Sequence, residues 1–461
     1  MTRGGEKNKK MSDNHAIHRN LTESVRKAKN AKIASTLKAT KERRANSVCR
    51  VFDLKISKSH ISREQKEALK RVFLEAKWLR NDALANGIFD YEIGKTADVL
   101  VGDHHETREL NHLGSQMKQS VVKQLKQDVY DLSKAKKKGC HVGQLKFKRF
   151  VNSIELKQYG TTYRFKNEKM TRIKIQRIPG TFRVSGASQI PSDAEIANAR
   201  LVRRPDGYHV LVTVFLSRDS EYVTRQDEFE PGTVVGVDMG LKASLTLSDG
   251  SLVNVHVGVS DRVRRLQRKL VRQVRGSNGY ERTRARLRRE YGRVSRVKDD
   301  VATKVTRDLL RNEIVYFQDE SLSAWKSRSG FVRGGRKVQD SILGRVKARL
   351  ERSSRAVELP SSVPTTQFCP VCGSRTRHGV SERTFVCSAC GFSVDRDVNA
   401  ACNMVRFGQG YRPFSPVGCR FVLVEGVASA DGAVLGAACA SHGYIDAICK
   451  QSSLKQEAPR L

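Results

Sequence analysis

Two pairs of closely spaced cysteines most constrain what this chain can fold into. Cys369 and Cys372 form one CxxC pair, and Cys387 and Cys390 form a second after fourteen intervening residues. Each pair can turn two thiolates toward one ion, and the glycine after each pair suits the turn. Four thiolates fill the shell of Zn²⁺ and leave no position for a substrate. The spacing predicts a zinc ribbon with one structural ion that supplies its folding energy; redox or catalytic use is the minor alternative.

The remaining cysteines and the hydropathy favour an intracellular protein. The six other cysteines show no pairing pattern, which is typical of reduced thiols. No apolar run is long enough to span a membrane, and the N-terminus lacks the apolar part of a signal peptide. We therefore expect a soluble protein with no membrane partner. These six are Cys49, Cys140, Cys402, Cys419, Cys439 and Cys449.

The charge of the chain indicates an anionic partner. There are 86 Lys and Arg residues against 48 Asp and Glu, a formal net charge of +38 over 461 residues. A solvated charged surface is the alternative, but such surfaces usually mix signs and here long stretches do not. Nucleic acid is the partner we expect. Residues 1–46 are a basic arm with almost no aromatic residue, and we expect it to be disordered.

The first half of the chain predicts a β-barrel with helices inserted in it. Residues 47–57 alternate as a strand, and the period of two returns in residues 145–150, 172–178 and 208–215. Between them, Ser62 and Gln65 form a capping box for a helix that ends near Gly87. Apolar spacing predicts a second helix around residues 121–132, while residues 88–119 give no clear prediction.

The second half predicts a different αβ unit. Residues 232–257 read as three adjacent strands with a tight turn at Asp249–Gly250. Two basic helices follow, within residues 263–274 and 287–309. The later expectations are strands at 313–318 and 356–359, helices at 342–350 and 398–405, and no clear signal beyond Gly408.

Three acids stand at the ends of these predicted elements. Asp238 ends a buried strand, Glu320 follows another, and Asp397 begins a helix just after the ribbon. Two Mg²⁺ ions about 4 Å apart need carboxylates that converge from separate elements. Each acid alone is more often a turn or cap residue. The order of elements is compatible with a ribonuclease-H-like sheet in which the acids meet at one edge.

Several short motifs resemble one known family. GVDMG at 236–240, QDESL at 318–322, TTQFCPVCG, CSACG and DRDVNAA at 395–401 resemble the TnpB proteins of insertion sequences and the compact type V CRISPR effector nucleases. The resemblance covers residues 48–405 in layout and is specific in 232–405; KQEAP near the C-terminus also resembles the tail of some transposon-borne members. It implies an RNA-guided DNA endonuclease with a RuvC-like domain interrupted by a zinc ribbon.

The resemblance assigns roles to particular residues. Asp238, Glu320 and Asp397 match the catalytic acids that bind two Mg²⁺ ions, with Asp319 as the fallback for Glu320. The D-x-N-A-A motif selects Asp397, and Asp395 is free to cap the helix that follows. The ribbon is expected to fix the position of Asp397, so loss of Zn²⁺ should also lower catalysis.

The expected partners are a guide RNA and a double-stranded DNA target with a short flanking motif. The basic helices 262–275 and 282–296 would hold the heteroduplex or a displaced strand. The glycine-rich loop 327–335, with Arg328, Arg333 and Arg336, is either a lid or a disordered connector. We expect a cytoplasmic prokaryotic protein, either a monomer or an RNA-bound homodimer. The candidate nucleic-acid contacts are Arg264, Arg265, Arg268, Lys269, Arg272, Arg286 and Arg289.

The sequence as a whole predicts an α+β multidomain protein. The expected domains are a basic arm at 1–46, a β-barrel wedge domain at 47–218 with a helical recognition insertion at about 60–140, a RuvC-like domain at 232–363 and 395–408, a target nucleic-acid-binding zinc ribbon at 364–394, and a tail at 409–461.

Three other functions were weighed against guided cleavage. A guided DNA-binding protein that does not cut would be expected to have lost an acid. A transposase that catalyses strand transfer could use the same three acids, but it would need no guide RNA. A zinc-ribbon nucleic-acid chaperone would leave the acids unexplained.

Overall fold

The computed structural model of the chain falls into two units, Met1–Gln226 and Asp227–Leu461. It describes residues 23–423 apart from 24, 26, 29, 90–93, 226, 242–243, 256, 323, 327–334, 380–381 and 415–419. Within this described part no helix is both long and apolar enough to cross a membrane.

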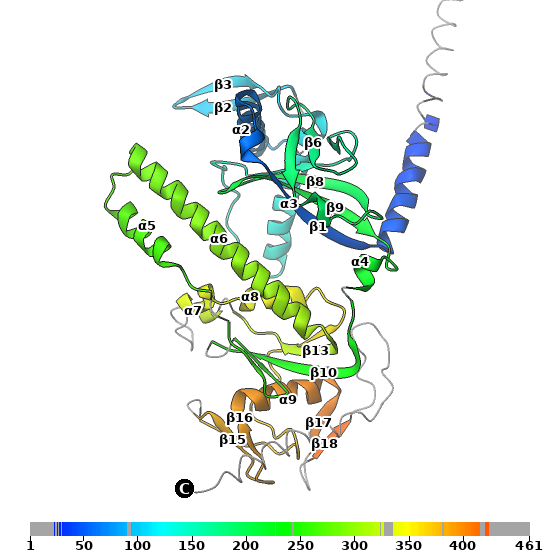
Figure 1. Cartoon of the computed structure of the whole chain (residues 1–461), viewed down its shortest axis with the longest axis vertical. Coiled ribbons are helices and arrows are strands. Elements are labelled where there is room, and N and C mark those ends of the chain that lie inside the picture. Colours follow the sequence, from blue (N-terminus) through cyan, green and yellow to red (C-terminus); the bar gives the residue numbers. More distant parts are fainter. Residues whose placement is uncertain are drawn as a thin grey trace, which may run out of the picture. The chain divides into compact units, whose positions relative to one another are not determined.

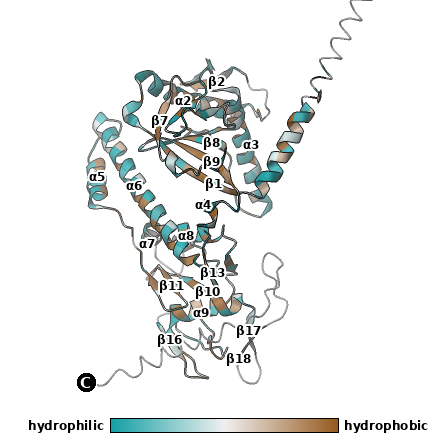
Figure 2. Ribbon diagram, turned by 45° about the vertical axis from the view of Figure 1, so that its right-hand side comes forward, coloured by the Kyte–Doolittle hydropathy of each residue, from teal (hydrophilic) through white to brown (hydrophobic). Residues whose placement is uncertain are grey.

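A seven-stranded antiparallel sheet forms the first unit and curls into a nearly closed barrel (Figure 1). Alternate residues such as Leu54 and Ile56 are fully buried, as expected where one face of each strand lines a core. The apolar character of β1, β8 and β9 is visible in Figure 2. In spatial order the strands are β4 (Ser153–Leu156), β8 (Glu195–Arg204), β9 (Gly207–Leu216), β1 (Val48–Ile56), β7 (Phe182–Ser185), β6 (Arg172–Ile175) and β5 (Tyr163–Phe165).

The two helices predicted from the sequence lie between β1 and β4. They are α2 (Arg63–Ala85) and α3 (Ser115–Lys137), which pack their apolar faces against the barrel core. The predicted capping box is present: the Ser62 side chain accepts from the Gln65 amide, and the Gln65 side chain accepts from the Ser62 amide. Residues 88–119, for which no clear prediction was made, contain a two-stranded hairpin. The small elements of this unit are η1 (Lys58–His60), β2 (Thr96–Val101), β3 (His104–Glu109), η2 (Ala187–Gln189) and α4 (Glu221–Thr224).

Two expectations for this unit were wrong. Residues 30–45 form a helix where the basic arm was expected to be disordered, because Ala, Lys, Arg and Leu favour a helix even without a core to pack on. Residues 145–150 alternate like a strand but have no regular structure. Their backbone is held instead by a side chain: Asn81 bonds both the amide and the carbonyl of Lys148, at 2.9 and 3.0 Å. Residues 1–22 lie outside the described part.

The second unit is built on a five-stranded sheet in the order β12-β11-β10-β13-β14. The first three strands are antiparallel neighbours, which confirms the three adjacent strands predicted from the sequence, and β10, β13 and β14 run parallel. Parallel strands end at the same edge of a sheet, so residues that follow β10 and β13 lie near one another. The strands are β10 (Glu230–Met239), β11 (Leu245–Leu247), β12 (Leu252–Val253), β13 (Asn312–Gln318) and β14 (Ala356–Leu359).

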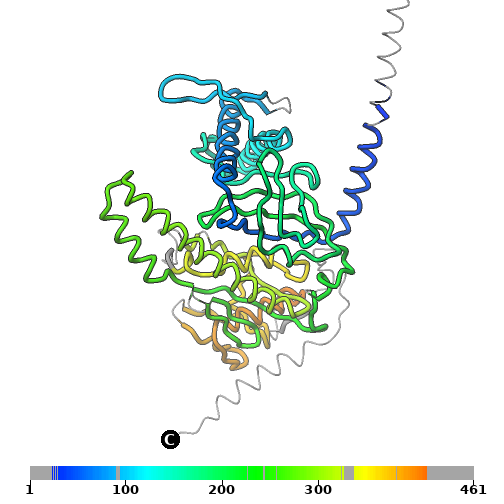
Figure 3. The backbone as a smooth tube through the Cα atoms, turned by 45° about the horizontal axis from the view of Figure 1, so that its top comes forward, coloured from blue at the N-terminus to red at the C-terminus, as the bar shows by residue number. Residues whose placement is uncertain are grey.

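Helices follow this sheet in the predicted order. The basic pair is α5 (Asp261–Val271) and α6 (Asn278–Leu309), which run side by side (Figure 3). Both helices are largely hydrophilic (Figure 2). Further along are η3 (Ala324–Lys326), α7 (Gly335–Asp340) and α8 (Leu343–Leu350). Most of the predicted glycine-rich loop, at 327–334, lies outside the described residues.

The last helix, α9 (Arg396–Gly408), packs on β10 and β13. Gly236 of β10 is essential to this contact, because a Cβ atom there would overlap the carbonyl oxygen of Ala401. Gly408 has the same role at the C-terminal end of α9, where a Cβ atom would overlap the ring of Tyr316. Two glycines therefore let the helix approach the sheet closely.

The ribbon hairpin β15 (Thr384–Val386) and β16 (Ser393–Asp395) runs directly into α9. A second hairpin, β17 (Tyr411–Phe414) and β18 (Arg420–Leu423), follows α9. Residues 424–461, including the KQEAP motif, lie outside the described part.

We expect Gly236→Ala to weaken the packing of α9 and to lower the thermal unfolding midpoint. Its methyl group meets backbone, which cannot rotate away, so the cost should reach or exceed the roughly 1–3 kcal/mol of ordinary overpacking. Differential scanning calorimetry measures the effect. The matched control is Gly292→Ala on α6, where the nearest atom is the end of the Arg296 side chain at 3.7 Å. That substitution should be neutral or stabilising, as in an exposed helix. Equal midpoints for the two variants would contradict the close-approach argument.

Candidate functional site

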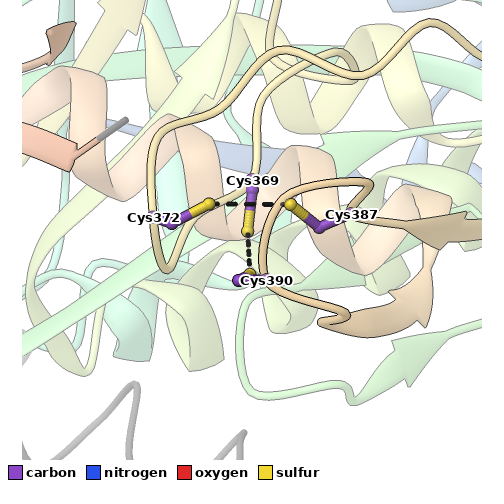
Figure 4. A group of neighbouring side chains, drawn as sticks. All are labelled: Cys369, Cys372, Cys387 and Cys390. Atoms are coloured by element: carbon purple, nitrogen blue, oxygen red, sulfur yellow. Dashed lines mark hydrogen bonds between the residues drawn. The ribbon is translucent and has the colours of Figure 1, made fainter. Parts of the chain in front are cut away.

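The four predicted zinc ligands converge on one point (Figure 4). All four sulfur atoms lie within 4.8 Å of one another. Sγ of Cys369 is 3.7 Å from that of Cys390, and Sγ of Cys372 is 3.6 Å from that of Cys387. A tetrahedron with Zn–S bonds of about 2.3 Å has edges of about 3.8 Å. The donor set therefore fits one Zn²⁺ ion with no position left for a substrate.

Two tight turns form the ribbon around these sulfurs. The amides of Gly373 and Gly391 donate to the carbonyls of Cys369 and Cys387, at 2.9 and 3.0 Å. Both glycines have a left-handed backbone, with φ of 76° and 75°, which other residues adopt only with strain. Burial raises the pKa of Cys369. A metal ion that displaces the thiol protons would relieve this cost of burial.

The ribbon ends where α9 begins, and Asp395 marks the junction. Its side chain accepts from the amides of Asp397 and Val398, at 2.8 and 3.4 Å. Asp395 is thus the N-cap of α9, as the sequence predicted. Its carboxylate is committed to the helix, and Asp397 lies in the first turn.

The structure brings Asp238, Glu320 and Asp397 into one electrostatic group. Asp238 lies next to the end of β10, and Glu320 lies two residues beyond the end of β13. Burial, followed by the charges of Asp397 and Glu320, raises the pKa of Asp238 well above its usual value. Burial also raises the pKa of Glu320. All three residues are partly exposed, while the carboxyl of Asp238 is buried.

Oxygen donors of this kind suit a hard divalent ion such as Mg²⁺. Carboxylates whose like charges raise one another's pKa values are stabilised in the ionised form by a cation bound between them. Among the described residues, however, only the four cysteines are drawn together tightly enough to be recognised as a metal-binding set. The three acids therefore influence one another through their charges, but their oxygen atoms are not gathered as closely as the cysteine sulfurs.

Asp319 and Glu320 differ in their partners. Asp319 pairs with Lys347 of α8, which also contacts Glu358 at 2.9 Å and Glu351 at 3.5 Å. The charge of Glu320 helps to raise the pKa of Asp238. Lys347 thus pairs directly with Asp319 and also acts on Glu320 through its charge, which opposes the rise of the Glu320 pKa caused by burial.

Asp397 is contacted from the ribbon. Arg383, immediately before β15, lies 3.5 Å from its carboxylate, and Arg396 lies 3.8 Å away. The amide of Arg396 also donates to the carbonyl of Arg383 at 2.7 Å. A residue of the ribbon therefore touches a candidate functional acid directly.

Buried amide side chains tie α9 to the ribbon and tie β13 to the stretch just before the ribbon. On α9, Asn399 and Asn403 are fully buried and both donate to the carbonyl of Phe368, at 3.1 and 2.6 Å. Phe368 directly precedes the zinc ligand Cys369. On β13, Gln318 donates to the carbonyls of Pro360 and Val363 at 3.0 and 2.7 Å.

The sequence analysis missed this amide network. Asn399 is the Asn of the D-x-N-A-A motif, and Gln318 begins QDESL, so both stood inside quoted motifs. The available signal was a pair of amide side chains four residues apart on an otherwise apolar helix face, because buried amides must find hydrogen-bond partners.

The candidate nucleic-acid contacts are all exposed on the α5–α6 pair. Val263 and Leu287 face inward, and Arg262 pairs with Glu290 across the two helices at 3.0 Å. Arg264 also pairs with Asp261 at 3.1 Å. The hairpin thus presents many cations to solvent.

Two known domain families match segments that lie almost entirely in the second unit. Residues 217–314 match the family described as "Probable transposase", which includes β10 and the α5–α6 pair. Residues 343–404 match "Cas12f1-like, TNB domain", which includes the four cysteines and Asp397. The resemblance to the TnpB and compact type V family is confirmed. Glu320 lies between the two matched segments.

Individual relatives of the TnpB type are also similar. The chain is 29% identical over 226 residues to "Putative RNA-guided DNA endonuclease InsQ" of Escherichia coli strain K12, across 43% of this chain and 56% of that protein. It is 27% identical over 267 residues to "Putative RNA-guided DNA endonuclease" of Streptomyces pristinaespiralis, across 53% and 65%. The chain thus spans less than two thirds of the length of either relative.

A solved structure is similar as well. It is titled a cryo-EM structure of a Cas12f1–sgRNA–target DNA complex, with 12% identity, a TM-score of 0.39, and coverage of 74% of this chain and 78% of that one.

Asp238→Asn should stabilise the protein in buffer without magnesium. The folded-state pKa of Asp238 is raised, so its contribution to stability is greatest at low pH and is lost as pH rises from the ordinary carboxyl range through the raised folded value. At pH 7 the ionised form therefore opposes folding. We expect a higher unfolding midpoint for the variant at pH 7, and a difference from wild type that shrinks as pH falls.

Thermal unfolding across a pH series measures this difference. The control is Asp249→Asn in the exposed turn after β11, which removes the same charge away from the acids. Added Mg²⁺ should raise the wild-type midpoint more than that of Asp238→Asn. A midpoint of Asp238→Asn that matches wild type at every pH would contradict the repulsion.

Proposed function

We propose that this chain is an RNA-guided DNA endonuclease that hydrolyses DNA phosphodiester bonds next to a short flanking motif, in association with a transposon. The observation that carries the proposal is the electrostatic group of Asp238, Glu320 and Asp397 at one sheet edge. Two of these acids lie within the matched families, and the relatives' names support guided cleavage of DNA. A CRISPR-like setting is the other context that the family allows.

The sheet order of the second unit supports a ribonuclease-H-like, RuvC-type nuclease domain. On this proposal residues 232–363 and 395–408 form the domain, and the ribbon at 364–394 interrupts it. The two parts meet where α9 packs on β10 and β13. In the first unit, the barrel would be the wedge domain and α2 and α3 the recognition insertion.

The mechanism follows from where the carboxylates stand. Asp238, Glu320 and Asp397 would hold two Mg²⁺ ions, which supply the charge that activates water and stabilises the leaving 3′ oxygen. Asp238 would remain ionised in the loaded site, because bound cations cancel the repulsion that raises its pKa. Arg383 would orient Asp397 from outside by pairing with its carboxylate, and Lys347 would hold Asp319 beside Glu320. The product would carry a 5′ phosphate.

Guide RNA and double-stranded DNA are the proposed partners. Base pairing with the guide would select the sequence, while the exposed cations of α5 and α6 would follow the backbone of a heteroduplex or displaced strand. We propose that the protein acts in the cytoplasm of a prokaryote, as a monomer or an RNA-bound homodimer.

Strand transfer is the second candidate, favoured by the description "Probable transposase" for residues 217–314. The two activities differ in their products. Hydrolysis leaves free ends, whereas strand transfer joins one DNA to another and needs no guide RNA.

We expect a discrete RNA to copurify with the chain when it is expressed with its native flanking DNA. RNA sequencing identifies it, and a 3′ end that matches DNA beyond a transposon end would indicate the TnpB setting. The purified complex should then cut a matching DNA only with Mg²⁺, and Asp238→Asn or Asp397→Asn should lower the rate by several orders of magnitude. Joined DNA products without any RNA would instead establish the transposase.

Cys390→Ser should lower zinc content and DNA cleavage together. Loss of the ion frees the turn at Cys369, and with it the Phe368 carbonyl that Asn399 and Asn403 hold. The position of Asp397 then loses its support. Metal analysis and cleavage assays measure both effects. Cys140→Ser, at an exposed cysteine outside the cluster, is the control. Full cleavage with zinc lost would refute the coupling.

A further inference from the structure

Each carboxylate oxygen of Asp397 faces a different arginine. Oδ2 lies 3.5 Å from Nη1 of Arg383, and Oδ1 lies 3.8 Å from Nε of Arg396. A cation that takes Asp397 as a ligand must therefore bind beside two guanidinium groups. Because like charges on one carboxylate repel each other, these arginines affect how readily that cation binds.

The two arginines are held in different ways. Arg396 is anchored to the ribbon, since its amide donates to the carbonyl of Arg383 at 2.7 Å and its Nη1 donates to the carbonyl of Glu382 at 3.1 Å. Its side chain is only 20% exposed. The side chain of Arg383 is 50% exposed, and within the part of the chain that the structure describes its guanidinium contacts Asp397 alone. Arg396 is thus a fixed cation, whereas Arg383 is free to leave.

The hairpin of the ribbon places both arginines. Arg383 directly precedes β15 and Arg396 directly follows β16, so they lie beside each other at the open end of the hairpin. The other end of the hairpin carries the turn with Cys387 and Cys390. One short hairpin therefore joins the zinc cluster to the acids, and the fold of the ribbon determines where Arg383 stands.

We propose that Arg383 is a resident counter-ion of Asp397 that weakens the binding of Mg²⁺ to the acids, so that the zinc ribbon sets the Mg²⁺ concentration at which the site is loaded. This inference rests on the proposed function, which makes Asp397 a ligand of Mg²⁺. While the site is unloaded, the ion pair orients Asp397 and balances part of the negative charge of the acids.

The same ion pair opposes loading. Arg383 and a bound Mg²⁺ are two cations on one carboxylate, whether or not they share an oxygen atom. An ion pair this open to water is weak and breaks easily. Arg383 is therefore the cation that gives way, while Arg396 keeps its place on the ribbon.

A Mg²⁺ titration of the full chain tests the counter-ion. The unfolding midpoint is measured by calorimetry at constant ionic strength, and its rise with Mg²⁺ reports binding without any DNA cleavage. We expect Arg383→Gln to lower the Mg²⁺ concentration of the half-maximal rise about two- to fivefold, the effect of losing one exposed ion pair. Without Mg²⁺ the same variant should unfold at a slightly lower temperature than wild type.

Two variants serve as controls. Arg383→Lys keeps the charge and should keep the half-maximal concentration close to that of wild type. Arg375→Gln removes another exposed cation of the ribbon, whose side chain donates to Gln367 at 2.6 Å and not to an acid. It should leave the half-maximal concentration unchanged. An equal shift in Arg375→Gln would overturn the proposal, because net charge alone would then explain the effect.

The direction of the shift separates two roles of Arg383. If the arginine only orients Asp397 for the metal, Arg383→Gln should need more Mg²⁺ than wild type, and that result would also overturn the proposal. Metal analysis should find the same Zn²⁺ content in every variant, which shows that the ribbon is intact. Should Arg383→Gln lose zinc, Arg383→Met, which keeps the aliphatic part of the side chain, takes its place in the titration.

Failure of this inference is distinguishable from failure of the proposed function. If Mg²⁺ raises the midpoints of wild type and Arg383→Gln with the same half-maximal concentration, the counter-ion role alone is wrong. If Mg²⁺ leaves the wild-type midpoint unchanged, the acids bind no Mg²⁺, and the proposed nuclease site and the counter-ion both fail.

Discussion

The close packing of α9 on β10 and β13 is the contact on which the second unit depends. It brings Asp397, in the first turn of α9, beside Asp238 at the end of β10. A helix normally stands off a sheet by the length of its side chains. Here Gly236 and Gly408 remove that spacing at two points of the contact, since a methyl group at either would overlap the neighbour. The position of one acid relative to another is thus determined by two residues that carry no functional group.

The ribbon extends this contact into a continuous support. Zinc coordination by Cys369 would fix the preceding Phe368, whose carbonyl accepts from both Asn399 and Asn403. Gln318, two residues before Glu320, holds the stretch just before the ribbon from β13. Buried amides of this kind are costly unless every partner is in place. On the proposed function, part of the free energy of metal binding would therefore stabilise the arrangement of three carboxylates whose charges repel one another.

Element order and local chemistry could be predicted from the sequence, whereas close approach and tertiary partners could not. The capping box at Ser62, the N-cap at Asp395 and the zinc spacing depend on neighbouring residues, and the structure contains all three. The prediction of a strand at residues 145–150 was wrong, because an alternating pattern cannot reveal that Asn81 takes backbone hydrogen bonds that a partner strand would need. From the sequence, Gly236 could be recognised only as part of a motif, because Ala401, which it meets in the folded chain, lies far away along the sequence. Glu320 could be ranked above Asp319 by resemblance, but the physical distinction is the engagement of Asp319 by Lys347.

The positive charge of the α5–α6 pair suits a surface that follows a nucleic-acid backbone rather than one that reads a sequence. Its cations are exposed, so their attraction to phosphate is long-ranged, weakly directional and reduced by salt. On the proposed function, such a surface would let a duplex slide and adjust, while base pairing with the guide would select the sequence.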